Sequence, residues 1–538
     1  MVRYTPSSQL TIEGFSTPFE QHLNAQNRWV ELATALPWDS MAKIYIQNLQ
    51  QDKGRLSVDV RMALGALIIK HKLKFSDREV VQTITENVYL QYFCGLSSFC
   101  TRAPFDASLF VDLRKRMGAD KFDAMNRILI TRAEAFLPTS KRKSSRSAPV
   151  DDNTDTPESA ADGASKETPD KASLPGPAAN KGTLKIDATV ADQCITYPND
   201  LKLVSTSRWE SERLIDALWE KLRATENPPT VKPRSYRRQA RKRYLDMARK
   251  KNKAKSRLRK AIGQQLRYLR RNLGHIEKML NAIGSQRFPL SLRDQRIYWV
   301  IQHIYNQQHQ MWQNKVHSIP HRIVNIYQPY VRPILRGKDK AKVEFGAKIS
   351  ASEYDGFTTI DHISWEAFNE GKDLIGQAEK YRSTFGCYPE LLLADSIYLN
   401  RENRKWMKSK GVRIVGKPLG RPPREQLSAY QKRKRKKERN QRNHVEGKFG
   451  QAKYGYRLHE IRAKRQDTSE AWMSCIFFIT NLITFMKLWE KYAQNLLFGL
   501  RQALIYPLGQ AHGQRMLIRK PISQHSNINN YKLYCRAA

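Results

Sequence analysis

Three acidic residues stand in contexts that suit chemistry on phosphodiesters. Asp187 lies within the predicted strand 184–190, Asp395 directly follows the apolar run 391–394, and Glu446 lies in a predicted helix rich in cations. Binding sites in α/β sheets form at the carboxyl ends of strands, where a carboxylate suits a hard cation. In-line displacement at phosphorus can use two metal ions held by carboxylates from different elements. One acid alone is usually a surface charge, so the prediction of a two-metal site depends on all three together.

The elements that must position these acids follow an α/β pattern. The continuous apolar run 391–394 is typical of a strand buried on both faces. A turn at 354–356 separates two segments with strand character. In chain order, the sequence predicts strands 343–349 and 357–363, helix 366–384, strand 391–394, helix 400–411 and strand 412–415.

Residues 1–138 are predicted to be helical. Ser76 and Glu79 have the spacing of a capping box and predict a helix start, and a further helix is expected after Pro104 with Asp106 as its cap. Short helices with tight turns fit a DNA-reading helix-turn-helix and a dimerisation bundle equally well. Residues 139–181 are rich in Ser, Pro, Ala, Asp and Glu, which predicts a disordered linker because so few apolar groups cannot offset the ordering entropy.

Residues 208–316 are predicted to form a helical insertion into the catalytic core, whose two parts are 182–207 and 317–500. Apolar residues recur at steps of three and four from Leu258 to Ile283, as on one face of a long amphipathic helix. Phe288 and Pro289 break this pattern before a second helix, which predicts an antiparallel hairpin. Residues 501–538 are left as a C-terminal tail.

Positive charge is concentrated in this insertion. The chain has 94 Lys and Arg against 51 Asp and Glu, a formal net charge of +43. Residues 232–271, here called the basic arm, contain 18 Lys and Arg and the single acid Asp246. Charge of one sign at this density repels itself unless a polyanion shares the surface, so nucleic acid is the expected partner. The candidate DNA-binding residues here are Arg241, Lys242, Arg243, Lys250 and Lys251.

A second cationic run leads into Glu446. Residues 432–442 contain eight Lys and Arg in eleven positions, among them Lys436, Lys437 and Arg439. A nuclear-targeting signal would have a similar composition. Its position before the third acid favours a segment that follows DNA.

The remaining composition indicates a cytoplasmic protein. Six cysteines are scattered without a CxxC pair, which argues against a disulfide framework and a structural zinc site. The N-terminus lacks the apolar run of a signal peptide. The most apolar stretch, 475–489, is judged too short and too polar to span a bilayer, so no membrane role is expected.

Several segments resemble one family. The sequences KIDATV (185–190), LLLADSIYLNRENR (391–404) and RNHVEGKFGQAKYGYR (442–457) are similar to the three acidic blocks of bacterial insertion-sequence transposases of the DDE class, and more narrowly of the group named after insertion sequence five. Residues 67–96 and the motif PFDASLF (104–110) resemble the helical N-terminal domain of that group, and VEFGAKIS and KPLGRPP also match it. The resemblance covers most of the chain outside the linker.

The resemblance implies a ribonuclease H-like catalytic fold that depends on Mg²⁺, with Mn²⁺ as a possible substitute. It implies that Asp187, Asp395 and Glu446 are the first, second and third catalytic acids. The related signature Tyr-x2-Arg-x3-Glu-x6-Lys is met at Arg442, Glu446 and Lys453, whereas Arg439 replaces the tyrosine. Arg442 and Lys453 would bind phosphates of the element ends, and the helical spacing predicts that they share one helix face with Glu446.

The sequence therefore predicts a DNA transposase that cleaves strands at element ends and joins the freed 3′-hydroxyl to target double-stranded DNA, as a homodimer in the synaptic complex. Two other functions stay open. One is a metal-dependent nuclease or resolvase on the same fold, and the other is a non-catalytic DNA-binding protein derived from a transposase.

Overall fold

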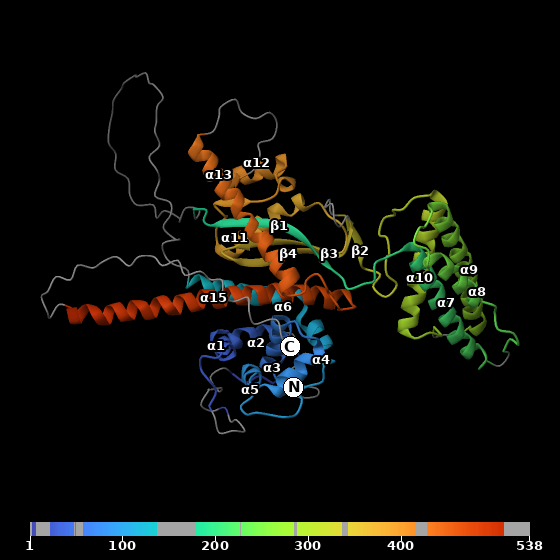
Figure 1. The fold of residues 1–538 in the computed structure, drawn as a ribbon, viewed down its shortest axis with the longest axis horizontal. Coiled ribbons are helices and arrows are strands. Elements are labelled where there is room, and N and C mark those ends of the chain that lie inside the picture. The colour runs from blue at the N-terminus through green and yellow to red at the C-terminus, as the bar shows by residue number, and fades with distance from the viewer. Residues whose placement is uncertain are drawn as a thin grey trace, which may run out of the picture. The chain divides into compact units, whose positions relative to one another are not determined.

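The computed structural model describes residues 3–6, 15, 22–47, 49, 57–136, 179–225, 228–284, 288–335, 343–415 and 428–509 (Figure 1). The chain divides into two units, Met1–Met486 and Lys487–Ala538. The predicted linker 139–181 falls outside the described residues except for its last three positions. The motif KPLGRPP and residues 510–538 of the predicted tail also fall outside them.

The N-terminal region is helical, as predicted. Its helices are α1 (Arg28–Ala35), α2 (Trp38–Ile46), α3 (Val60–Leu73), α4 (Asp77–Glu86), α5 (Val88–Phe93) and α6 (Leu109–Glu134). The capping box at α4 is confirmed, since the Ser76 hydroxyl accepts from the Glu79 amide while the Glu79 carboxylate accepts from the Ser76 amide. The predicted cap of the later helix is wrong, because Ser108 precedes α6 and Asp106 instead accepts from the Ser108 amide.

Six strands form one mixed sheet, consisting of β1 (Thr183–Asp192), β2 (Arg332–Leu335), β3 (Val343–Tyr354), β4 (Phe357–Ser364), β5 (Leu391–Leu393) and β6 (Arg413–Val415). The strand order is β2-β3-β1-β5-β6, and β4 also pairs with β3. Strand β3 is antiparallel to its three partners, whereas β1, β5 and β6 run parallel. The predicted strands are confirmed, and the region is mixed α/β.

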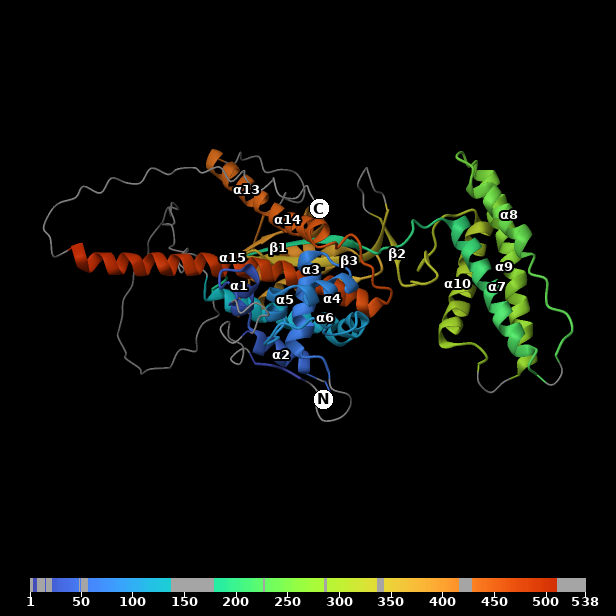
Figure 2. The ribbon, with the colours of Figure 1, turned by 60° about the horizontal axis from the view of Figure 1, so that its bottom comes forward.

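Helices cover the two faces of the sheet. Ala191, Ala347, Ile349 and Ala351 form one core with Val445 and Phe449, which belong to α14 (Asn443–Gly450). Helix α14 lies against β1 in Figures 1 and 2. Because Asp187 pairs with Ala351 in the sheet, its side chain shares the face that α14 covers. This packing brings the third acidic block to the strand that carries the first.

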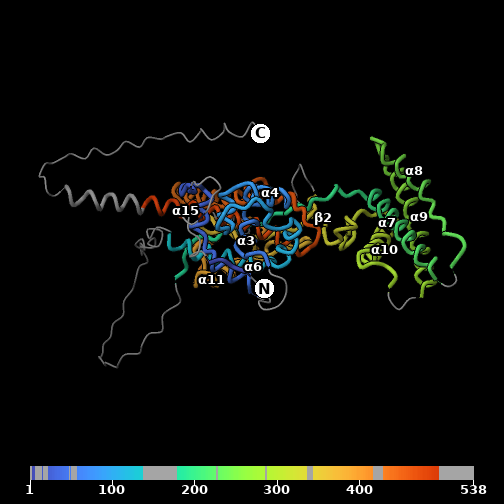
Figure 3. Tube along the Cα trace, turned by 90° about the horizontal axis from the view of Figure 1, so that it is seen from below, coloured from blue at the N-terminus to red at the C-terminus, as the bar shows by residue number. Residues whose placement is uncertain are grey.

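The chain leaves β1, forms four helices and returns to β2 (Figure 3). These helices are α7 (Asp200–Leu222), α8 (Arg237–Ala248), α9 (Lys255–Ile283) and α10 (Leu292–Asn314). The predicted break between the last two is confirmed. Helix α7, most of which lies in the segment predicted to be helical although no separate helix was predicted there, packs with α9 and α10 around a core that includes Leu214, Leu269 and Ile301. Since α7 begins at Asp200, the helical part starts before the predicted position 208.

Two other predicted helices are present, and the first is shorter than predicted. The segment predicted as helix 366–384 contains a 3-10 turn at Glu370–Lys372 and then α11 (Leu374–Phe385). Helix α12 (Arg401–Ser409) agrees with its prediction. The predicted start at 366 is wrong, since residues 366–369 are not helical and α11 begins only at Leu374, after the 3-10 turn.

Helix α15 (Gln466–Gly509) is longer than the apolar stretch predicted near its start. By length and composition, Gln466–Asn495 could cross a membrane, with a mean hydropathy of 1.5. The prediction that this region is too short to do so is therefore wrong. In the structure, 72% of the apolar window is buried. Phe478 contacts Phe122 of α6, and Asn481 donates to Asn126, so this part of α15 is a core helix.

Candidate active site

Asp187 lies in the middle of β1, beside the point where the neighbouring parallel strand ends. The register pairs Lys185 with Leu393, the last residue of β5. Continued by two residues, this register sets Asp395 opposite Asp187. Asp395 itself lies two residues past the carboxyl end of β5, which is the kind of position where binding sites form in sheets of this kind.

The Asp187 carboxyl is largely buried, with 16% of its side chain exposed. Burial raises its pKa to about 6 because the charged form loses hydration. The amide of Ala188 and the guanidinium of Arg442 act in the opposite direction, whereas Glu370 and Glu446 add to the rise. Asp187 is thus a carboxylate in surroundings that favour a nearby positive charge.

Arg442 connects the first acid to the third. It lies between α13 (Ala429–Gln441) and α14, and its guanidinium bonds Asp187 at 3.2 Å and Glu446 at 2.6 Å. The Glu446 side chain is half exposed. Strand β1 and helix α14 are more than 250 residues apart in sequence, so their packing alone lets one cation contact both carboxylates.

Asp395 occupies a more open position. It caps the short turn Ser396–Tyr398, and its carboxylate accepts from the Ser396 amide at 2.7 Å. In the described part of the chain, no ion pair reaches it. An exposed carboxylate without a cationic partner keeps its oxygens available to a ligand.

Metal binding was predicted for these three acids. Among the residues that the structure describes, no group of three or more His, Cys, Asp or Glu side chains is gathered closely enough to hold a metal ion. Their chemistry nevertheless fits a hard divalent cation, because carboxylate oxygens are its preferred ligands. A guanidinium already bridges two of the three, which indicates that this position attracts positive charge.

The prediction that Arg442, Glu446 and Lys453 share one helix face is wrong. Helix α14 ends at Gly450, and Lys453 lies in the π-helical segment Gln451–Gly455. The i→i+5 pattern of that segment changes the angular spacing on which the prediction depended. Lys453 instead lies 3.7 Å from Glu344 of β3, whereas Arg442 faces the acids.

The other candidate DNA-binding residues lie on two exposed helical surfaces. Helix α13 carries Lys436, Lys437 and Arg439, and the ion pair between Arg413 and Glu438 at 2.8 Å fastens this helix to β6. The second surface, on α8 and the segment after it, carries Arg241, Lys242, Arg243, Lys250 and Lys251, all of them exposed.

Two features of the site were not predicted from the sequence. Glu370, in the turn before α11, contributes to the raised pKa of Asp187. Lys185 and Glu353 form a buried ion pair between β1 and β3, on the face that also carries Asp187. No local motif marks either residue. The alternation of β1 could have signalled Lys185, since it is two residues from Asp187 and must share its face.

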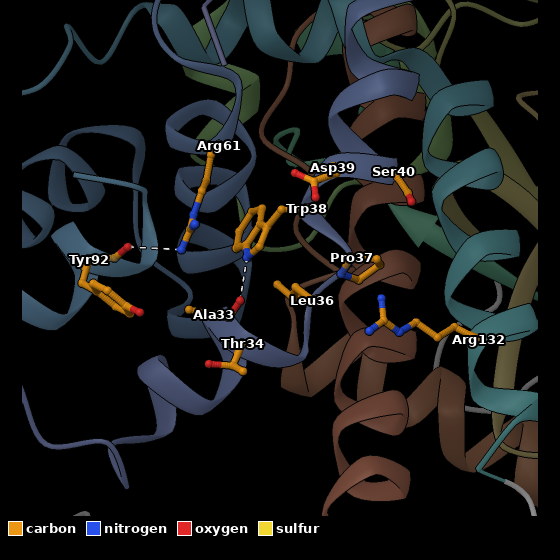
Figure 4. A pocket seen from close by; sticks show the side chains of 10 residues that line it. All are labelled: Ala33, Thr34, Leu36, Pro37, Trp38, Asp39, Ser40, Arg61, Tyr92 and Arg132. Carbon is orange, nitrogen blue, oxygen red and sulfur yellow. Dashed lines mark hydrogen bonds between the residues drawn. The ribbon is translucent and has the colours of Figure 1, made fainter. Parts of the chain in front are cut away.

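A separate cavity of about 410 Å³ lies within the N-terminal helices (Figure 4). Arg61 donates to the carbonyl of Tyr92, and the indole of Trp38 donates to the carbonyl of Ala33. These donors are satisfied within the protein, and none of the three acids lines the cavity.

Comparison with known proteins gives two domain matches. Residues 392–483 match the Transposase DDE domain, and residues 17–116 match the Transposase domain (DUF772). Over 117 residues, the chain is 33% identical to the uncharacterized protein ORF8 in the nfe locus of Rhizobium meliloti. That alignment covers 22% of this chain and 55% of the relative, so the chain spans about half of the relative's length. No solved structure matches the chain significantly.

The two domain matches lie in different parts of the fold. The first contains Asp395 and Glu446 and runs from β5 into α15, and the second covers the helices from α1 to α5. An N-terminal transposase domain and a DDE domain therefore occur in one chain, in the order that the sequence motifs predicted. Both matches are to transposase domains, and together they support a DDE transposase of an insertion sequence.

Proposed function

We propose that the protein is a DNA transposase that cleaves strands at the ends of a mobile element and joins the freed 3′-hydroxyl to target DNA. The observation that supports this proposal is the contact that acids from two distant elements make with one guanidinium. Asp187 of β1 and Glu446 of α14 contact the Arg442 guanidinium, and Asp395 follows the end of β5, the strand that runs parallel to β1. The mixed sheet that holds the two aspartates is proposed to be a ribonuclease H-like core, in a transposase of the group named after insertion sequence five.

Asp187, Asp395 and Glu446 would hold divalent metal ions, Mg²⁺ or in its place Mn²⁺. When bound, such ions stabilise the negative charge on the attacking and leaving oxygens of phosphodiester displacement. The carboxylates suit this role for different reasons. The burial of Asp187 limits competition from water, while the exposure of Asp395 and Glu446 leaves a side open to a DNA strand.

Arg442 would act as the counter-ion of the carboxylates before DNA and metal ions bind. Its side chain is 24% exposed, and its guanidinium can form bidentate bonds to a phosphate. An incoming strand would draw Arg442 from the acids to its own phosphate, which couples DNA binding to release of the carboxylates. Lys453, on the adjoining π-helical segment, is proposed to contact a second phosphate of the element end.

The two exposed cationic surfaces would hold the rest of the DNA. Lys436, Lys437 and Arg439 on α13 precede the third acid, so they are suited to follow the strand next to the cleavage site. The basic arm on α8 and α9 would hold double-stranded DNA through its phosphates, since neutralising phosphates releases counterions. Synapsis of two ends implies a homodimer, and we place the protein in the cytoplasm with the bacterial nucleoid.

The proposal is tested with a labelled element end, target DNA and Mg²⁺. Asp187→Asn, Asp395→Asn and Glu446→Gln should each reduce cleavage and strand transfer by at least about 100-fold, because each removes a carboxylate that would hold the metal ions stabilising the attacking and leaving oxygens. Binding of the element end should remain close to that of the unaltered protein. Glu402→Gln, an exposed acid of α12, is the matched control and should leave both activities unchanged.

The products distinguish the alternatives. Joined donor–target products support a transposase. Cleavage without joined products from the same donor would indicate a nuclease or resolvase instead. If the unaltered protein bound the element end but neither cleaved nor joined it, or if the three acidic variants retained full activity, the proposed catalytic role would be wrong.

A further inference from the structure

A cavity of about 180 Å³ lies where the N-terminal helices meet the catalytic region, and we call it the junction pocket. Its walls come from the end of α3, the start of α4, the first part of α6, residues 456–463 and α15. None of the three proposed catalytic acids lines it. The pocket therefore requires an explanation separate from the catalytic site.

The lining of the junction pocket is strongly cationic. The positive side chains outnumber the two acids, Asp77 and Glu460. Burial lowers the pKa of His71 well below its usual range, so this ring is neutral. The lining cations are Lys70, Lys74, Arg114, Arg457 and Arg462.

Two of these cations are buried and share one acid. Lys70 is 3% exposed and Arg114 is 6% exposed. Lys70 bonds Asp77 at 2.5 Å, and Arg114 bonds the same carboxylate at 3.1 Å. Two buried positive charges with one negative charge leave an excess that is costly in a poorly hydrated interior. A bound anion would neutralise it.

Hydrogen-bond donors in the wall also lack acceptors. Within the described chain, the donors Arg114 Nε and Trp472 Nε1 are shielded from solvent and have no acceptor. His71 Nε2, which donates or accepts according to the tautomer of the neutral ring, also has no partner. These groups are packed together, since Lys70 and Arg114 lie 4.6 Å and 5.0 Å from the Trp472 ring and His71 meets it edge-on. Buried polar groups are nearly always satisfied, so this cluster calls for an acceptor.

Two cations at the outer part of the pocket are held in the left-handed region of backbone space. Lys74 has a φ of 62° and Arg457 a φ of 59°, which is unfavourable for residues with a Cβ. Lys74 donates to the carbonyl of Tyr454. The Arg457 side chain has no hydrogen bond or ion pair in the described part of the chain. Strain of this kind often accompanies a ligand site.

We propose that the junction pocket binds a phosphate group. A phosphate supplies the negative charge needed to neutralise both Lys70 and Arg114, which share the single carboxylate of Asp77. Its oxygens can also accept from several donors at once. Lys74 and Arg457 would meet it at the outer side. The phosphate could belong to a DNA strand or be a free ion. In either case it would connect the N-terminal helices to the catalytic region, because the lining residues come from both.

The first test measures thermal unfolding of the full-length protein in sodium phosphate and in sodium chloride of equal ionic strength. Phosphate should raise the unfolding temperature in a saturable manner. The double variant Lys74→Gln/Arg457→Gln should lose this rise, and it should fold because neither side chain is fully buried. The control Lys43→Gln/Lys464→Gln removes two exposed charges that do not line the pocket and should keep the rise.

The second test measures binding of a DNA duplex as salt is varied, and this part rests on the proposed function. If a strand phosphate occupies the pocket, the Lys74→Gln/Arg457→Gln variant should bind the duplex more weakly. The slope of log affinity against log salt concentration should be smaller in magnitude by about 0.9 for each phosphate contact that is lost. The Lys43→Gln/Lys464→Gln control should lose less duplex affinity.

The outcomes separate the two sources. Loss of the phosphate effect with unchanged duplex binding supports a free phosphate ligand, and loss of both supports a strand phosphate. If phosphate stabilises the protein no more than chloride does, and the variant binds duplex as its control does, the proposal is overturned. The first test does not need catalytic activity, so it can fail or succeed whatever the outcome for strand transfer.

Discussion

At the scale of single residues, Arg442 determines how the negative charge of the catalytic acids is neutralised. Arg442 is one guanidinium between two carboxylates, at 3.2 Å from Asp187 and 2.6 Å from Glu446. It keeps the negative charge of the site compensated although Asp187 is largely buried. A divalent cation that binds these carboxylates must compete with this side chain. Arg442 therefore stabilises the packing that brings Asp187 and Glu446 together. In the absence of DNA, it also opposes metal binding.

The substitution Arg442→Gln should separate these two effects. Without DNA, Mn²⁺ should bind about five-fold more tightly, which corresponds to loss of an ion pair worth roughly 1 kcal/mol at this exposure. Without metal, the variant should unfold at a lower temperature, because Asp187 loses its counter-ion. Electron paramagnetic resonance of free Mn²⁺ and thermal unfolding measure these quantities. Arg439→Gln is the control, because Arg439 does not contact the acids, and it should change neither the Mn²⁺ affinity nor the unfolding temperature. Weaker Mn²⁺ binding in Arg442→Gln would contradict the proposed competition between Arg442 and the metal ion.

At the scale of elements, the long strands β1 and β3 determine where the acids lie. Their antiparallel register pairs Asp187 with Ala351 and Asp192 with Gly346. Gly346 also pairs with Arg332 of β2, so it lies in the middle of three strands. A Cβ at Gly346 would lie 1.9 Å from the carbonyl oxygen of Ala191. The close approach of these strands therefore requires glycine at this position.

Replacing Gly346 with alanine should lower the free energy of unfolding by about 3 kcal/mol, because backbone atoms must move apart to admit the methyl group. It should also reduce cleavage, since the shift occurs in the strand pair that holds Asp187. Chemical denaturation measures the stability. Gly376→Ala in α11 is the control, because its Cβ meets no atom within 4 Å, and it should be neutral or stabilising by up to about 1 kcal/mol. Equal stability of the two variants would refute the steric argument.

At the scale of the whole molecule, the net charge of +43 is not spread evenly. Exposed cations gather on α8 and α13, while others line the junction pocket. The insertion can carry its charge because α7, α9 and α10 supply an apolar core of their own. A folded bundle can hold a cationic surface in fixed positions, whereas an unstructured segment of the same composition could not.

A variant with Arg241, Lys242, Lys250 and Lys251 all changed to glutamine should bind duplex DNA more weakly at physiological salt. The slope of log affinity against log salt should fall by up to about 3.6 if each residue contacts one phosphate. Fluorescence anisotropy across a salt series measures this slope. Arg243 is left intact because it bonds the Tyr268 hydroxyl. An unchanged slope would exclude the arm as a DNA-binding surface.

The amino-acid sequence by itself determined the local features. The strands around Asp187 and before Asp395, the capping box of α4 and the break after α9 follow from short-range patterns. Such features depend on alternation, helix periodicity and capping, which act over a few residues. For the same reason, the prediction for Lys453 failed, because a π-helical segment interrupts the assumed period.

Only the tertiary structure determined which residues that are distant in sequence become neighbours. The contact of Arg442 with Asp187 joins residues 255 positions apart, and the parallel pairing of β5 with β1 sets the strand before Asp395 next to the strand that carries Asp187. The junction pocket combines α3, α6 and α15 in the same way. These neighbours are chosen by burial of the α14 and α15 faces against the sheet and by strand pairing. Both are long-range energies that no local sequence window contains.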